Sequence, residues 1–318
     1  MANPRFTDKR LVFFTGKGGV GKSALSAALG IALARRGHRV LLCEMNAQSR
    51  MAPLFGVKQV GYEPVMLERN LFALNITPRE ALEEYMRIVF KFKLIYDRVI
   101  NNNLFKVFTK ALPGMDDLVT VGKIWYLEQE RDRSGRPVWD RIIVDAPATG
   151  HGITFLRFPQ AAIDTVRVGP IAKSAEQMRD LFLDERITSV NLVTLAEELP
   201  VNETIELFHS LQDIVGTPFG AVFVNAVFPQ LFAGPAGEYV RGGDEKPLVP
   251  AAGALAGGLL EAARTELSRY ELNRRHIERL MESVKLPPVE LPYVFRESFD
   301  RQSLEVLAKR LEETLEPA

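Results

Sequence analysis

The chain has 318 residues, 47% of them hydrophobic, and its 40 basic and 40 acidic side chains balance to a formal net charge of zero. This length suits one large α/β domain, or one domain with a subdomain, and the balanced charge lacks the basic surplus that nucleic-acid binding requires. Cys43 is the sole cysteine, which excludes disulfides and thiolate clusters within the chain, and with no leader or membrane span expected we predict a cytoplasmic protein.

The first element in chain order is a strand, glycine loop and helix. An apolar run at 11–14 precedes the loop, and a helix-forming run starting at Ala24 follows it. This order is typical of a phosphate-binding loop, in which backbone N–H groups and the helix N-terminus face a phosphate. The residues expected to contact the nucleotide are Gly16, Gly18, Gly19, Val20, Gly21, Lys22, Ser23 and Ala24.

Two side chains of the loop have predicted chemical roles. Lys22 is expected to reach the β- and γ-phosphates of a nucleoside triphosphate, and the Ser23 hydroxyl is expected to bind Mg²⁺. The alternative, a chance glycine-rich turn, is disfavoured because the flanking strand and helix are both present.

A second lysine distinguishes this loop from an ordinary one. Lys17 follows the first glycine directly, and the loop resembles the deviant phosphate loop of the MinD/ParA/ArsA group of dimeric ATPases. That resemblance implies that Lys17 crosses a subunit interface and stabilises charge on the partner's nucleotide, as an arginine finger does. The alternative is a solvated loop lysine, although two such close cations repel one another without a phosphate between them.

Further strands are expected at 39–43, 71–76, 138–144, 190–195, 220–225 and 289–291. Because helical segments separate them, the pattern predicts an α/β fold with a doubly wound, mostly parallel sheet of the P-loop NTPase type. Its active edge should lie at the carboxyl ends of the strands.

A helical subdomain is expected to be inserted into this core. Thr77, Pro78 and Glu80 form a capping box that predicts a helix start, and further helices are expected at 104–111, 115–129 and 161–184. We interpret residues 1–318 as a single ATPase domain whose helical subdomain comprises about 77–132 and 155–186. The apolar surface of these helices fits a client groove, a core packed on both sides or a dimer contact.

Asp145 ends an apolar strand, where its carboxylate is expected to hold Mg²⁺ through water. The alternative role for an aspartate at a strand end is a helix cap. The polar turn at 146–151 that follows is suited to sensing the γ-phosphate.

The motifs together resemble the ArsA family, which comprises the arsenite-pump and tail-anchored-protein-targeting ATPases. The resemblance implies ATP and Mg²⁺ as ligands, a nucleotide-dependent dimer, an adenine-reading Asn225 and a second loop at Pro292 that closes over the base. The segments that carry it are 112–117, 145–151, 196–204, 222–225 and 291–292.

The first switch departs from the family pattern. Ungapped alignment puts Asn46 where the family has the aspartate that orients the attacking water, and an amide cannot accept a proton from that water. Glu44, two residues earlier on the same side of a strand, is the candidate substitute. We therefore predict slow hydrolysis.

The remaining departures concern assembly. The family's interfacial cysteine pair and its three arsenite-binding cysteines are absent. The glutamate-bearing first switch resembles bacterial ArsA relatives of the actinobacterial type, which can occur as paired paralogues. Because the chain has one phosphate loop, we expect a homodimer, or a heterodimer with an ArsA-like paralogue. The two functional hypotheses are a hydrolysing switch that acts on a client, and a weakly hydrolysing or inactive regulatory subunit.

The last part of the chain is expected to contain a mobile loop, at 231–253, and two helices. A long amphipathic helix should end near Ser283, and the terminal helix should cover 304–315. The terminal helix mixes Lys and Glu, which argues against a MinD-like role at a membrane surface.

Overall fold

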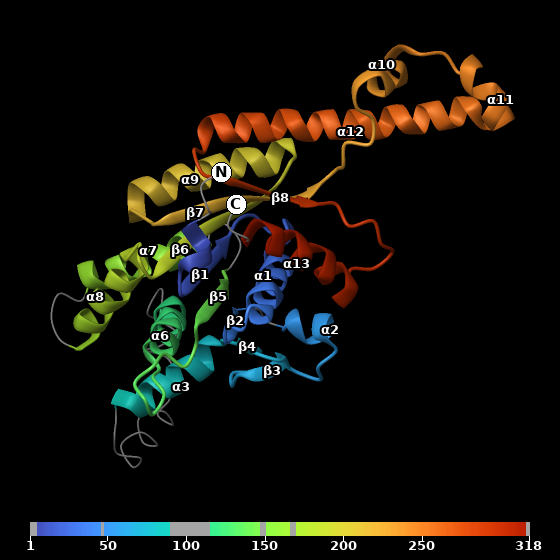
Figure 1. The fold of residues 1–318 in the computed structure, drawn as a ribbon. Helices are drawn as coiled ribbons and strands as arrows, with labels where there is room; N and C mark the ends of the chain where they lie inside the picture. The colour runs from blue at the N-terminus through green and yellow to red at the C-terminus, as the bar shows by residue number, and fades with distance from the viewer. Residues whose placement is uncertain (1–4, 46–47, 90–114, 147–150, 166–169, 316–318) are drawn as a thin grey trace.

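A computed structural model describes residues 5–45, 48–89, 115–146, 151–165 and 170–315 (Figure 1). These residues form an eight-stranded sheet in the order β3-β4-β2-β5-β1-β6-β7-β8, which confirms the predicted α/β fold. The strands are β1 (Leu11–Thr15), β2 (Val40–Glu44), β3 (Val65–Glu68), β4 (Leu71–Asn75), β5 (Arg141–Asp145), β6 (Thr188–Leu195), β7 (Phe219–Val227) and β8 (Pro288–Pro292).

All adjacent strands are parallel except β3 and β4, which form an antiparallel hairpin. Strand β3 was not predicted, because this edge strand contains no fully buried residue and so lacks the apolar pattern of its neighbours. Asn70 in the connecting turn has a φ of 64°, a left-handed conformation that asparagine tolerates better than most residues.

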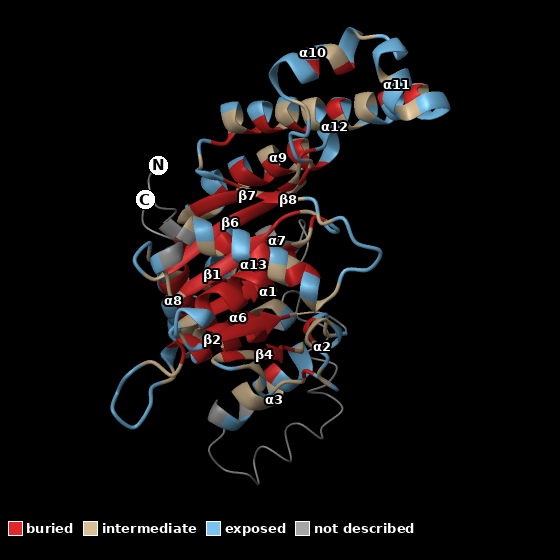
Figure 2. Cartoon of the chain, turned by 45° about the vertical axis from the view of Figure 1, so that its right-hand side comes forward, coloured by how far each residue is buried: buried red, intermediate tan, exposed pale blue. Residues whose placement is uncertain are grey.

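Helices cover both faces of the sheet (Figures 1 and 2). Side chains alternate along β1: Leu11 and Phe13 belong to a core shared with α6 to α9, whereas Val12 and Phe14 belong to one shared with α1 and α13. The helices are α1 (Lys22–Arg35), α2 (Met51–Phe55), α3 (Pro78–Val89), α6 (Met115–Gln129), α7 (His151–Thr165), α8 (Pro170–Leu183), α9 (Glu198–Val215), α10 (Gly234–Gly242), α11 (Val249–Ala252), α12 (Ala256–Ser283) and α13 (Arg301–Leu315).

The predicted start of α3 is confirmed. The Thr77 hydroxyl accepts the Glu80 N–H at 3.3 Å, as an N-cap residue does, and it donates to the Glu80 carboxylate at 2.5 Å. Helices α6, α7 and α8 contribute Val121, Phe155 and Met178 to the core beneath the sheet, so their apolar faces are used at least partly in packing. The expected helix at 104–111 lies outside the described residues.

Most of the segment at 231–253 is helical, so the prediction of a mobile loop there was wrong in its secondary structure. It contains α10, α11 and two 3₁₀ turns, η2 (Lys246–Leu248) and η3 (Gly253–Leu255), and its prolines stand in first helical turns, where a missing N–H costs little. Together with the amino-terminal half of α12 these helices form an arm that projects beyond the sheet (Figure 1). Arg264 of α12 fastens α10 by donating to the carbonyls of Val240 and Gly243 at 3.1 and 2.8 Å.

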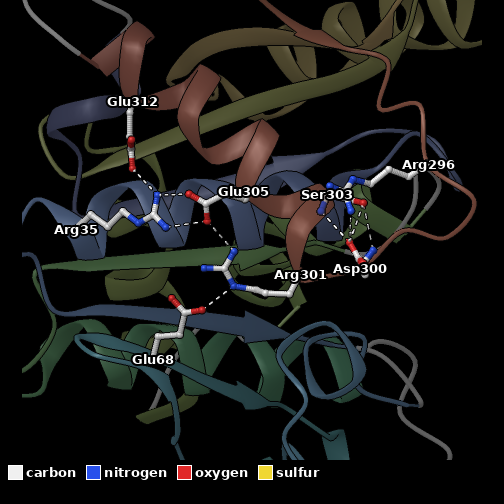
Figure 3. Close-up of polar contacts among 8 residues, drawn as sticks. All are labelled: Arg35, Glu68, Arg296, Asp300, Arg301, Ser303, Glu305 and Glu312. Atoms are coloured by element: carbon white, nitrogen blue, oxygen red, sulfur yellow. Dashed lines mark hydrogen bonds and ion pairs between the residues drawn. The ribbon is translucent and has the colours of Figure 1, made fainter.

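Helix α13 is tied to α1 and to the sheet edge by ion pairs (Figure 3). Arg301 contacts Glu68 of β3 at 2.6 Å and Glu305 at 3.0 Å, while Arg35 of α1 contacts Glu305 at 2.6 Å. Asp300 accepts the Ser303 N–H at 2.9 Å and so caps the first turn of the helix. These contacts hold the first turns of α13 against α1 and β3.

Cys43 is fully buried in β2, and burial raises the pKa of its thiol, as expected of an inert structural cysteine. Among the residues described, no helix has the length and apolar character needed to cross a membrane.

Candidate nucleotide-binding site

The phosphate loop joins β1 to α1 and surrounds the amino end of that helix. Gly16, Gly19 and Gly21 have φ values of 151°, 87° and 97°, a region that glycine adopts without strain. At Gly21 space also excludes a side chain, because a Cβ would lie 2.2 Å from Nδ2 of Asn225. The shape of the loop therefore requires the glycines, and the loop touches the end of β7.

The ammonium group of Lys22 is directed back into the loop. It donates to the carbonyl oxygens of Gly16 and Lys17 at 2.9 and 2.8 Å. Desolvation lowers the pKa of Lys22, the negative charge of Asp145 opposes this, and the charge of Arg50 adds to it. A buried cation in this position favours an anionic ligand, because an added negative charge offsets its desolvation.

The two expected metal ligands lie together. The Ser23 hydroxyl donates to the Asp145 carboxylate at 2.5 Å, although 122 residues separate them along the chain. The sheet register explains this, since Asp145 at the end of β5 is aligned with Phe14 of β1. A hydroxyl and one carboxylate are hard oxygen ligands of the kind Mg²⁺ uses when phosphates and water complete its coordination. The donor set fits the expected metal.

Glu44 ends β2 beside this pair and is aligned with Asp145 in the sheet. Glu44 is fully buried. Its carboxylate accepts hydrogen bonds from the Ser49 hydroxyl at 2.5 Å and from the backbone N–H groups of Arg50 and Met51 at 2.8 and 3.3 Å. Burial raises the pKa of Glu44, and these three hydrogen bonds partly offset that rise. Both carboxylate oxygens thus hold the start of α2.

Some predicted residues of the two switches lie outside the described part of the chain. Asn46 is one of them, as are 147–150 of the second switch, and the side chain of His151 is not described either. The proposed exchange of roles between Asn46 and Glu44 therefore stays a prediction.

Lys17 forms an ion pair within its own chain. Its ammonium group lies 2.6 Å from Oε1 of Glu203 in α9, and the two side chains are 32% and 31% exposed. Glu203 belongs to the segment 196–204 that carries part of the family resemblance. No local sequence pattern predicts this pair, because its members are 186 positions apart.

The expected adenine side of the site is formed by the ends of β7 and β8. Asn225 donates from Nδ2 to the Val20 carbonyl at 3.0 Å, which connects it to the phosphate loop. Pro292 ends β8 and is aligned with Val227. Just beyond these strand ends, the rings of Phe228 and Tyr293 stack with centroids 4.9 Å apart.

Two residues at the site were not singled out from the sequence. A cavity of about 660 Å³ separates the phosphate loop from α2, and Arg50 and Phe299 contribute to its lining together with Gly21 and Ser23. The local signal for Arg50 is its position shortly after Glu44, a strand-end acid. Nothing local marks Phe299, which the fold brings in from beyond β8.

The comparisons with known proteins agree with this geometry. The family model described as anion-transporting ATPase (ArsA ATPase) matches residues 9–173 and 166–234. The ATPase BagA of Mycobacterium tuberculosis is 35% identical over 230 residues, which cover 71% of this chain and 67% of that protein.

Relatives with arsenical-pump names are more distant. A putative arsenical pump-driving ATPase of Prosthecochloris vibrioformis is 27% identical over 256 residues, covering 68% of this chain and 60% of the relative. An arsenical pump-driving ATPase of Acidiphilium multivorum is 31% identical over 240 residues, covering 69% and 40%. On the extent of the family match, supported by a strand–loop–helix site of the expected form, the chain belongs to the ArsA family of ATPases.

Proposed function

We propose that the chain binds ATP with Mg²⁺ and hydrolyses it slowly, as a nucleotide-driven switch. The observation that carries this proposal is the contact between Ser23 and Asp145 at 2.5 Å, beside the buried ammonium group of Lys22. Lys22 would bind the β- and γ-phosphates, and Ser23 and Asp145 would hold Mg²⁺, which neutralises phosphate charge during transfer. In such reactions the protein contributes mainly positioning and electrostatics.

Titration calorimetry with ATP in the presence of Mg²⁺ or of EDTA tests this proposal. We expect binding to weaken on chelation and to be lost in Lys22→Ala, whereas Lys285→Ala, which changes an exposed lysine after α12, should bind as the wild type does. Unchanged affinity in Lys22→Ala would contradict the whole assignment.

Preference for adenine is proposed to come from Asn225. Its Nδ2 is used on the Val20 carbonyl, so the amide oxygen is the group oriented to meet a base edge. An oxygen acceptor matches the exocyclic amine of adenine and repels the carbonyl that guanine has at the same position. Calorimetry that finds equal affinities for ATP and GTP would refute this part.

The switch is proposed to act as a dimer, a homodimer or a heterodimer with an ArsA-like paralogue, in the cytoplasm. Lys17 would leave Glu203, 2.6 Å away in this structure, and reach the nucleotide of the partner. Helices of the proposed subdomain, about 77–132 and 155–186, would transmit the nucleotide state to a client. Light scattering that finds a monomer in every nucleotide state would oppose this.

A second function, the weakly hydrolysing regulatory half of a heterodimer, is favoured by one feature of the first switch. Asn46 cannot act as a base, and both oxygens of nearby Glu44 accept hydrogen bonds from the start of α2. Steady-state phosphate release by the purified chain, with and without a co-purifying paralogue, separates the two functions. Turnover that requires the paralogue supports the regulatory role.

Several relatives are named as arsenical pump-driving ATPases, and those names describe the relatives. Cys43, the single cysteine of this chain, is fully buried in β2, and a buried thiol with a raised pKa is a poor soft-metal ligand. We therefore propose a client that is not held by a cluster of cysteine thiolates.

A further inference from the structure

The cavity between the phosphate loop and α2 has a cation on its outer wall. Gly19, Gly21 and Ser23 line one side, Arg50 and Pro53 the other, and the volume is about 660 Å³. A cavity of this size holds a ligand larger than a few waters. Arg50 is an exposed residue, so a ligand can reach its guanidinium without a rearrangement of the core.

The backbone under Arg50 is fixed from inside the sheet. Its N–H donates to Oε1 of Glu44 at 2.8 Å, and Ser49, the preceding residue, donates its hydroxyl to Oε2 of the same carboxylate at 2.5 Å. Ser49 Oγ also accepts the Ala52 N–H at 3.1 Å and so caps the first turn of α2. The buried Glu44 carboxylate therefore fixes the position of the Arg50 backbone, from which the Arg50 side chain extends.

The guanidinium is directed toward the metal side of the phosphate loop. Nη1 of Arg50 lies 3.3 Å from Oγ of Ser23, and that hydroxyl is bonded to Asp145 at 2.5 Å. The ammonium group of Lys22 contacts the Gly16 carbonyl of the same loop at 2.9 Å.

Two cations thus lie near one short loop, and their like charges repel one another. An anion placed between them removes this repulsion. The planar guanidinium is also the side chain best matched to two oxygens of one phosphate.

We infer that Arg50 binds the terminal phosphate of the nucleotide held by its own chain, as a charge-stabilising arginine in cis. This inference rests on the proposed function, and it adds a cation from the first switch to the phosphate loop's Lys22. Because Arg50 directly precedes α2, a γ-phosphate bound to its side chain would act on the start of that helix. Lys17, by contrast, is proposed to act on the partner's nucleotide.

The test compares ATP with ADP, since these differ by the phosphate that Arg50 is inferred to hold. Affinities for both nucleotides with Mg²⁺ are measured for the wild type, Arg50→Ala, Arg50→Lys and the control Arg79→Ala, whose side chain is 89% exposed on α3. One hydrogen bond to a charged group corresponds to about a 10- to 100-fold change in affinity. We expect Arg50→Ala to lower the ratio of ATP to ADP affinity by about that factor.

Arg50→Lys should retain part of the preference for ATP, because lysine keeps the positive charge but cannot bind two oxygens of one phosphate as the guanidinium does. Arg79→Ala should leave the ratio of ATP to ADP affinity unchanged. If ATP and ADP affinities of Arg50→Ala fall equally, or do not fall, the inference is overturned while the proposed function stands. If the wild type binds neither nucleotide, both fail together. Thermal unfolding of each variant identifies misfolding. If Arg50→Ala is misfolded, the ratio of ATP to ADP affinity in Arg50→Lys decides, and a ratio equal to that of the wild type overturns the inference.

Discussion

The ion pair between Lys17 and Glu203 must break if Lys17 is to reach a partner's nucleotide, so its strength opposes dimer closure. The side chains are 32% and 31% exposed, and pairs of this exposure contribute about 0.2–1 kcal/mol. Oε2 of Glu203 is buried and, among the described residues, has no hydrogen-bond partner, which favours the upper part of that range. Closing a homodimer breaks two such pairs, about 0.4–2 kcal/mol in total.

Glu203→Gln removes this cost, and we expect it to tighten ATP-dependent dimerisation by about 2- to 30-fold. Sedimentation velocity over a concentration series with Mg²⁺ and ATP measures the dimer constant. Glu206→Gln, which neutralises an exposed glutamate one turn along α9, is the matched control and should change it little.

The double variant Lys17→Ala with Glu203→Gln completes a cycle. The gain from Glu203→Gln should vanish when Lys17 is already absent, because the interaction it removes no longer exists. The reasoning is refuted if Glu203→Gln weakens the dimer, since Glu203 would then be needed in the closed state, or if the gain persists without Lys17.

Three further predictions concern the first switch and the arm. Asn46→Asp should raise ATP turnover, on the scale of about 10²–10⁴-fold for a general base, whereas fast turnover abolished by Glu44→Gln would assign that role to Glu44. Burial raises the pKa of Glu44 above its ordinary 4.5, so between these two values the folded state holds a proton that the unfolded state has lost. The free energy of unfolding should therefore fall as pH rises from about 4.5 through the folded pKa. Chemical denaturation over this pH range should show no such fall in Glu44→Gln. Arg264→Ala removes two bonds to the carbonyls of Val240 and Gly243 and should speed hydrogen exchange in α10, with unchanged exchange contradicting the proposed fastening.

The parts of the site that could be predicted are those encoded locally. The glycines of the phosphate loop are required by positive φ values, and Asp145 follows its apolar strand directly, so short sequence patterns were sufficient. The Lys17–Glu203 pair and the approach of Phe299 to the cavity depend on segments far apart in sequence, which no local pattern records. The proline and glycine content of the arm predicts a loop, because both residues usually break helices, but proline is well accommodated in a first helical turn.

The arm is also the part of the described structure best placed to enlarge a small change at the nucleotide site. Asn273 of α12 is buried and joins two segments that leave this site, since its Nδ2 donates to the Ala196 carbonyl and its Oδ1 accepts the Phe228 N–H, each at 2.9 Å. Ala196 leads to Glu203, and Phe228 follows the strand that ends near Asn225. From Asn273 to the start of α12 is about 26 Å of helix, so a tilt of about 5° at this point displaces the arm by ~2 Å. Under the proposed switch, the departure of Lys17 from Glu203 and the arrival of a base at Asn225 would each act on a segment that Asn273 bonds to α12.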